Sequence, residues 1–166
     1  MPEAVKVPLG TVVLGFDPGT RVTGWGVVAF NGSKLRHIAS GTWKAPKDVE
    51  RPALLADLSR FVATTLATYQ PVRVGLEEAF FALNVQSSLR LGEARGAVLA
   101  ACGTAGYAVN EYPPATVKKA VAGNGRADKS QVQFMIRKLL GLGDDEMALD
   151  ASDALAVAVT LAVDRL

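Results

Sequence analysis

Four carboxylates stand out because each one ends a predicted strand or begins a predicted helix. Asp17 follows the β-branched run TVVLGF, and Glu77 follows a second apolar run, VRVGL. Asp150 and Asp153 are three residues apart, which places both carboxylates on one face at the start of the last predicted helix. Ligands of open α/β sheets bind at the carboxyl ends of strands, so we expect Asp17 and Glu77 to share one crevice.

Each acid also has an ordinary structural explanation. An acid after a strand is often a turn or capping residue, and acids in a first helical turn favour the helix dipole. Asp153, however, falls in a stretch of Ala, Leu and Val that predicts a buried helix. Four carboxylates that converge would repel one another unless hard cations neutralise them. Because these ligands are all oxygens, Mg²⁺ or Mn²⁺ is the expected occupant.

The single histidine and the single cysteine are not expected to take part in this chemistry. His37 lies on a predicted strand far from the acids in sequence, and we interpret it as a solvated strand residue. Cys102 has no histidine near it, which favours an inert thiol buried on a helix over a reactive one. One cysteine forms no internal disulfide, and residues 1–10 lack a signal-peptide pattern, so we expect a cytoplasmic protein.

Composition and charge set the broad class of the protein. The chain has 166 residues, 49% of them apolar and 20% charged, as expected for one domain with its own core. No apolar run reaches the roughly 18 to 20 residues of a membrane span. The net charge is only +2, but residues 118–138 hold six basic residues and one acid, whereas residues 144–164 hold six acids and no base. This arrangement suits a metal site beside a polyanion track; two solvated faces of opposite sign are the alternative.

Hydrophobic periodicity predicts the elements that must position these residues. An antiparallel meander of three strands is expected at 11–16, 22–30 and 34–43. Two later strands are expected at 72–76 and 107–112, and helices at 51–69, 85–102, 113–121, 128–140 and 149–166. This order predicts an α/β fold in which helices flank both faces of a mixed sheet.

Four blocks of sequence, in this order, resemble the RuvC family of Holliday junction resolvases. They are GFDPGT (15–20) with GWG (24–26), Glu77 with Phe80 and LGEARG (91–96), KSQVQ (129–133), and DASDALA (150–156). An Asp-x-Gly-Thr motif alone is unspecific, but the ordered set is specific and covers nearly everything from Thr11 to the C-terminus. The resemblance implies a ribonuclease-H-like domain over residues 11–166, after a short extension at 1–10.

The resemblance also implies the activity, a Mg²⁺-dependent endonuclease that acts in homologous recombination and DNA repair. Asp17, Glu77, Asp150 and Asp153 would be its catalytic, metal-binding acids. Two metal ions about 4 Å apart would activate a water and stabilise the departing 3′ oxygen, leaving 5′-phosphate and 3′-hydroxyl ends. We expect Asp17 to bridge both ions, Glu77 and Asp150 to hold one each, and Asp153 to complete a shell or orient the water. Glu78 departs from the family pattern, and strand alternation should point it to the opposite face.

Further positions match residues that the family uses on DNA. Lys118 and Lys129 match basic positions near the DNA backbone, where a cation suits a phosphate; surface solvation is the alternative. Phe80 matches an aromatic that wedges or stacks at the unpaired bases of the junction, whereas Phe81 is assigned to core packing. The expected partners are four-way branched DNA and a branch-migration complex of the RuvA and RuvB type.

Symmetric cutting of two strands requires two active sites, so the resemblance to a homodimeric family directs attention to small residues on one helix. The helix from residue 85 to 103 has a stripe at spacings of four and three, which we predict to be a dimer seam. The seam consists of Val85, Leu89, Gly92, Gly96, Leu99 and Gly103. The alternative is that this stripe packs on the protein's own sheet.

Two rival functions share parts of this pattern. Actin-like sugar kinases and ATPases also have Asp-x-Gly-Thr after a strand, but they close two such domains around a nucleotide, and this chain has room for one. A catalytically silent binder of branched DNA would need a disrupted acid set, and all four acids are present.

Overall fold

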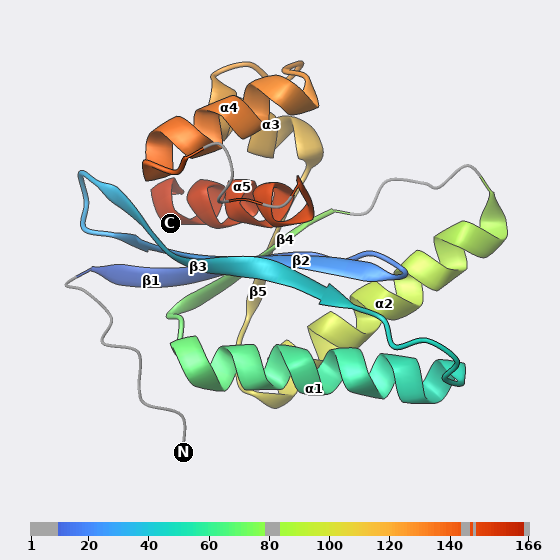
Figure 1. Cartoon of the computed structure of the whole chain (residues 1–166). Helices are drawn as coiled ribbons and strands as arrows, with labels where there is room; N and C mark the ends of the chain where they lie inside the picture. Colours follow the sequence, from blue (N-terminus) through green and yellow to red (C-terminus); the bar gives the residue numbers. More distant parts are fainter. Residues whose placement is uncertain (1–9, 79–83, 144–146, 148, 165–166) are drawn as a thin grey trace.

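The computed structural model describes residues 10–78, 84–143, 147 and 149–164 (Figure 1). Within these residues the chain forms one five-stranded sheet in the order β3-β2-β1-β4-β5. The strands are β1 (Thr11–Asp17), β2 (Val22–Phe30), β3 (Leu35–Lys44), β4 (Arg73–Glu77) and β5 (Val109–Tyr112). β2 is antiparallel to β1 and β3, whereas β4 is parallel to β1 and β5. The predicted mixed sheet is confirmed.

Helices cover both faces of this sheet. They are α1 (Arg51–Tyr69), α2 (Val85–Thr104), α3 (Pro114–Ala122), α4 (Lys129–Leu140) and α5 (Leu149–Val163). Figure 1 shows α1 and α2 on one face, and α5 on the other face with α3 and α4 beyond it. Leu14 and Phe16 belong to the core between the sheet and helices α1 and α2, whereas Val13 belongs to the core between the sheet and α5. Because β1 is buried on both faces, its sequence is apolar without alternation.

Glycine lets α5 approach β1 closely. A Cβ added at Gly15 would lie 2.3 Å from the carbonyl oxygen of Ala154 and 2.7 Å from the amide nitrogen of Ala158. Both atoms belong to the backbone of α5, so no side-chain movement relieves the overlap. Gly15 therefore sets the distance between the first turns of α5 and the end of β1.

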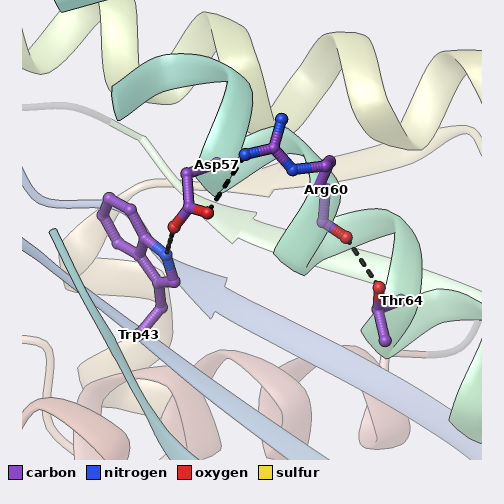
Figure 2. Close-up of polar contacts among 4 residues, drawn as sticks. All are labelled: Trp43, Asp57, Arg60 and Thr64. Carbon is purple, nitrogen blue, oxygen red and sulfur yellow. Dashed lines mark hydrogen bonds and ion pairs between the residues drawn. The ribbon is translucent and has the colours of Figure 1, made fainter. Parts of the chain in front are cut away.

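A hydrogen bond joins the edge strand β3 to α1, on the face of the sheet that α1 and α2 cover. Figure 2 shows the indole nitrogen of Trp43 donating to Asp57 Oδ2 at 3.0 Å, while Arg60 contacts the other carboxylate oxygen at 3.2 Å. The Thr64 hydroxyl in turn donates to the carbonyl oxygen of Arg60 at 2.9 Å. Trp43 is buried, so this contact satisfies a donor that would otherwise be desolvated without a partner.

Three predicted boundaries, in α2, β5 and α5, differ from the structure by two or more residues. Gly103 lies inside α2, which ends at Thr104. The turn comes later, where Gly106 has φ +84 and the Tyr107 amide donates to the carbonyl of Cys102 at 2.9 Å. Because Tyr107 caps the helix, β5 begins only at Val109.

The last helix is shorter than the predicted 149–166. It ends at Val163, and residues 165–166 lie outside the described part of the chain. Arg73 Nη1 donates to the carbonyl oxygens of Leu161 and Asp164, each at 3.1 Å. These two bonds satisfy carbonyl oxygens that the end of a helix leaves without a partner, which explains why the helix ends here. None of the helices described here is both long and apolar enough to span a bilayer.

Candidate active site

Asp17 and Glu77 are the last residues of two neighbouring parallel strands. In the ladder between β1 and β4, Phe16 lies opposite Leu76, so the next pair in register is Asp17 with Glu77. Two residues earlier on each strand, Gly15 and Gly75 both face α5. Since side chains alternate along a strand, both carboxylates point to the α5 side at the carboxyl edge of the sheet.

Helix α5 brings a third acid to this edge. Asp153 is half-buried and immediately precedes Ala154, whose carbonyl meets Gly15. A pocket of about 270 Å³ opens here, which we call the Glu77 pocket. Its lining consists of Glu77, Pro114, Val117, Lys118, Lys129, Val132, Asp153 and Ala156. The pocket therefore combines two carboxylates with two ammonium groups from α3 and α4.

The electrostatic environment of Glu77 favours an added positive charge. Burial is the main cause that raises the pKa of Glu77 above its ordinary value of 4.5, and the charge of Asp153 raises it further. Lys118 and Lys129 act in the opposite direction. A carboxylate that is desolvated beside a second acid binds a cation more favourably than an isolated surface carboxylate does.

Lys129 is fixed in the pocket by the start of α4. Asp128 accepts from the Gln131 amide at 2.8 Å, and the Gln131 side chain accepts from the Asp128 amide at 2.9 Å. This capping box makes Lys129 the first residue of the helix. Its Nζ lies 2.8 Å from Asp153 Oδ2, so a cation already neutralises this acid.

Lys118 reaches the pocket from α3. That helix begins at Pro114, whose fixed φ suits a first helical position, and it packs through Val117 and Val121. Lys118 follows Val117 and is half-buried, whereas Lys119 is exposed. The two lysines singled out from the sequence, Lys118 and Lys129, therefore line the same pocket as two of the predicted acids, Glu77 and Asp153, whereas Asp17 is not among its lining residues.

Two of the predicted site residues, Asp150 and Phe80, have side chains outside the described structure. Asp150 is the second residue of α5, but its side chain is not described. Phe80 and Phe81 lie within 79–83, which the structure does not describe. Among the side chains that are described, no three Asp, Glu, His or Cys groups are placed to hold a metal ion. The four-acid metal site therefore stays a prediction.

Sequence reasoning assigned no role to Arg95, which reaches this site from the opposite face. Its Nη1 donates to the main-chain carbonyl of Glu77, and its Nη2 pairs with the carboxylate of Glu111 on β5. The motif LGEARG included Arg95, but helical spacing alone does not reveal a contact between α2 and the end of β4. An arginine among the small residues of a packed helix was the only signal.

His37 and Cys102 lie outside the Glu77 pocket. His37 is on edge strand β3 with its Nε2 2.9 Å from the Ser40 hydroxyl, and it is half-buried rather than solvated as predicted. Cys102 is fully buried on α2, and burial raises the pKa of its thiol to about 11. A neutral, inaccessible thiol agrees with the prediction that Cys102 is inert.

The predicted dimer seam lies on the outer face of α2. Val85 and Leu89 are 77% and 63% exposed, and an added Cβ at Gly92, Gly96 or Gly103 would meet nothing within 4 Å. Only Leu99 packs partly on the core. Packing on the chain's own sheet therefore does not account for five members of the seam.

Comparison with known proteins gives close sequence matches. The family model for crossover junction endodeoxyribonuclease RuvC matches residues 13–161. The protein of that name from Geotalea uraniireducens is 48% identical over 147 residues, covering 89% of this chain and 85% of its own length. The one from Heliobacterium modesticaldum is 42% identical over 151 residues, covering 91% of this chain and 93% of its own.

Solved structures give the same match in three dimensions. Thermus thermophilus RuvC in complex with a Holliday junction substrate aligns with a TM-score of 0.85 at 36% identity, covering 90% of this chain and 92% of that one. The yeast mitochondrial Holliday junction resolvase Ydc2 aligns with a TM-score of 0.69 at 16% identity, covering 95% of this chain and 82% of that one. The second likeness concerns the fold alone.

Proposed function

The chain belongs to the RuvC family, whose fold is ribonuclease-H-like, and we propose that it resolves Holliday junctions by paired, symmetric cleavage of two DNA strands. The observation that carries this proposal is the Glu77 pocket at the carboxyl edge of the sheet. It places acids beside lysines, which is the combination that phosphodiester cleavage needs. The cut strands would carry 5′-phosphate and 3′-hydroxyl ends.

The residues of this edge fit divalent metal ions, and we propose Mg²⁺, with Mn²⁺ as a substitute. Asp17, Glu77, Asp150 and Asp153 would hold the ions, two in each active site. The support is the donor chemistry: only oxygen ligands, a Glu77 carboxyl whose pKa is raised by burial and by Asp153, and an Asp153 that already attracts a cation. When bound, the ions activate the attacking water and stabilise the leaving oxygen.

The lysines have a different task. Lys118 and Lys129 would contact the phosphate backbone on either side of the cleaved bond and bring it to the acids. Lys129 would exchange its contact with Asp153 for the DNA when both phosphate and cation are bound. Phe80 would stack on unpaired bases at the junction centre, which selects branched over linear DNA.

Cutting two strands requires two active sites, so the proposal includes an assembly of two chains. Two chains joined through the seam on α2 would present two pockets related by a two-fold axis. A branch-migration complex of the RuvA and RuvB type would deliver the junction, in the cytoplasm. The seam supports this because five of its six residues, all but Leu99, face away from the core of their own chain.

The decisive experiment compares a synthetic four-way junction with a linear duplex of the same sequence. We expect the chain to cut only the junction, at symmetry-related positions, with Mg²⁺ and not with EDTA. The variant Asp17→Asn keeps the shape of the site but removes a ligand charge, so we expect it to bind the junction without cutting it. Ca²⁺ should support binding with little cleavage, because its larger coordination shell positions a water poorly.

Each alternative predicts a different outcome. Cleavage by Asp17→Asn at nearly the wild-type rate would refute the assigned acids. A wild-type chain that binds junctions but never cuts them with Mg²⁺ would be a silent binder. Tight ATP binding in calorimetry would instead favour the actin-like ATPase reading.

A further inference from the structure

The peptide group that links Glu77 to Glu78 is bound on both sides by other elements. Its N–H, which belongs to Glu78, donates to the carbonyl oxygen of Tyr112 on β5 at 2.8 Å. Its C=O, which belongs to Glu77, accepts from Arg95 on α2. Because a peptide group is planar, these two bonds fix its orientation, and with it the direction of the last side chain of β4.

Arg95 is itself held in one orientation. Its side chain is only 13% exposed, and its second terminal nitrogen pairs with the carboxylate of Glu111. Glu111 lies opposite Leu76 in the ladder between β4 and β5, one residue before the bound peptide. The planar guanidinium therefore spans a carbonyl on β4 and a carboxylate on β5, which the single ammonium of a lysine does not do in the same geometry.

Arg95 and the charges in the pocket approach Glu77 from opposite faces of the sheet. The helix that carries Arg95, α2, packs on one face of the sheet, where Ala94 and Val98 belong to the same core as Leu76. Lys118, Lys129 and Asp153, which shift the pKa of Glu77, lie on the α5 side. Figure 1 shows α2 and α5 on opposite faces. Arg95 therefore acts on the backbone of Glu77 from behind the pocket.

From this geometry we infer that Arg95 is a positioning residue: it fixes the final peptide of β4 so that the Glu77 carboxylate points into the pocket at the angle that metal binding requires. The inference rests on the proposed function, because it assigns Glu77 a metal. Partners of a metal ligand that fix its orientation commonly contribute 10- to 100-fold to metal affinity or activity. We expect Arg95 to contribute at about the lower end of that range, because it acts through the backbone.

The test is Arg95→Lys, with Arg51→Lys as its matched control. Arg51 also pairs with a carboxylate, Glu93, and donates to a carbonyl, that of Arg90, but these two contacts join α1 to α2 and involve no residue of β4. Both changes keep the charge and remove the guanidinium. Melting temperatures of both variants show how much stability each loses, so a loss of stability can be distinguished from a loss of Glu77 positioning.

We expect three results from Arg95→Lys. Calorimetry with Mn²⁺ and no DNA should give an affinity about 10-fold weaker than in the wild type. Single-turnover cleavage should fall at low Mg²⁺ and recover partly at high Mg²⁺, while junction binding in EDTA stays unchanged. The Glu78 amide should exchange its hydrogen faster. Arg51→Lys should match the wild type in all three.

Other outcomes would overturn the inference. Wild-type Mn²⁺ affinity and cleavage in Arg95→Lys would remove the positioning role while leaving the proposed function intact. Equal losses in Arg95→Lys and Arg51→Lys, in proportion to their melting temperatures, would reduce Arg95 to a structural residue. A wild-type chain that neither binds Mn²⁺ nor cuts junctions would overturn the inference and the proposed function together.

Discussion

Single residues in the Glu77 pocket carry opposite charges that balance one another. Lys129 pairs with Asp153 at 2.8 Å, and the half-buried Lys118 lowers the pKa of Glu77 against the effects of burial and Asp153. Because both lysines line the pocket, a phosphate that enters it meets their ammonium groups. The next residue, Lys119, is exposed and does not line the pocket.

This difference gives a prediction for two adjacent lysines. Lys118→Ala should weaken junction binding and reduce the slope of log affinity against log salt by about one, because one phosphate contact is lost. Lys119→Ala has the same charge change and should leave the slope within error of the wild type. Binding measured by fluorescence anisotropy at several salt concentrations tests this. Identical slopes for the two variants would place Lys118 off the DNA path.

At the scale of elements, the site depends on how α5 lies against the sheet. Its first turns supply Asp150 and Asp153, and Gly15 allows its backbone to approach β1. Its last turn is bound by Arg73 of β4 through the carbonyl of Leu161, and Tyr112 of β5 binds Asp164, the residue after the helix. The helix is therefore located at both ends by contacts with the strands that carry or flank the strand-end acids.

Gly15→Ala should be strongly destabilising, by roughly 1 to 3 kcal/mol, because the new methyl group overlaps backbone atoms of α5. Gly75→Ala is the control, since its Cβ would meet side chains, the nearest being Val157 Cγ1 at 3.0 Å. The two changes affect the unfolded chain in the same way, so the difference reports the overlap. Urea denaturation measures both. A loss at Gly15 no larger than at Gly75 would contradict this account of the packing.

Tyr112→Phe tests the contact at the other end of α5. The Tyr112 hydroxyl donates to Asp164 Oδ2 at 2.7 Å, and its loss should cost about 1 kcal/mol near neutral pH. Burial first, and then the hydrogen bond and charge of Asp164, raise the pKa of Tyr112 from 10.0 to about 12. The folded state therefore retains this proton at a pH where the unfolded state has lost it.

The sign of the pH effect follows from linkage. The stability that Tyr112 contributes is fully present below pH 10 and is lost as the pH rises through the folded pKa of about 12. Stability curves of the wild type and Tyr112→Phe should thus run parallel up to pH 10 and converge above it. Denaturation from pH 8 to 12 measures this, and curves that stay parallel throughout would contradict the assigned contact.

At the scale of the whole molecule, the outer face of α2 is the surface on which the proposed dimer depends. Exposed Val85 and Leu89, with three open glycines along the same helix, form a surface that a second helix backbone could approach closely. Glycine in a helix costs about 1 kcal/mol relative to alanine, and a close helix–helix contact would offset that cost. The inner face of the same helix carries Arg95.

Gly96→Leu should separate the proposed dimer, because the new side chain would fill the space that the second helix needs. Paired cuts in a junction should then become isolated nicks. Asp17→Asn should remain dimeric, and so should Phe134→Ala, which removes an exposed apolar side chain, 54% exposed, on α4 instead. Sedimentation at micromolar concentration measures the mass. A monomeric wild type, or a dimeric Gly96→Leu, would rule out the seam.

Most of the elements were predictable from the sequence because their signals are local. The helix at Arg51–Tyr69 and the strand at Val22–Phe30 begin and end as expected, since periodicity, Pro and Gly mark them directly. The order of strands and helices, through their short connections, also determined the mixed sheet. The boundaries that failed, at Val109 and Val163, depend on caps supplied by Tyr107 and Arg73.

The same distinction between local signals and tertiary contacts applies to the site. Sequence position alone determined that Asp17 and Glu77 end strands and that Asp150 and Asp153 begin one helix. Only the tertiary structure decided that Lys129 neutralises Asp153, that Lys118 enters the same pocket, and that Arg95 binds the peptide after Glu77 from behind. These contacts join residues 18 or more positions apart. Their energies depend on distance and burial in space, which no local pattern in the sequence encodes.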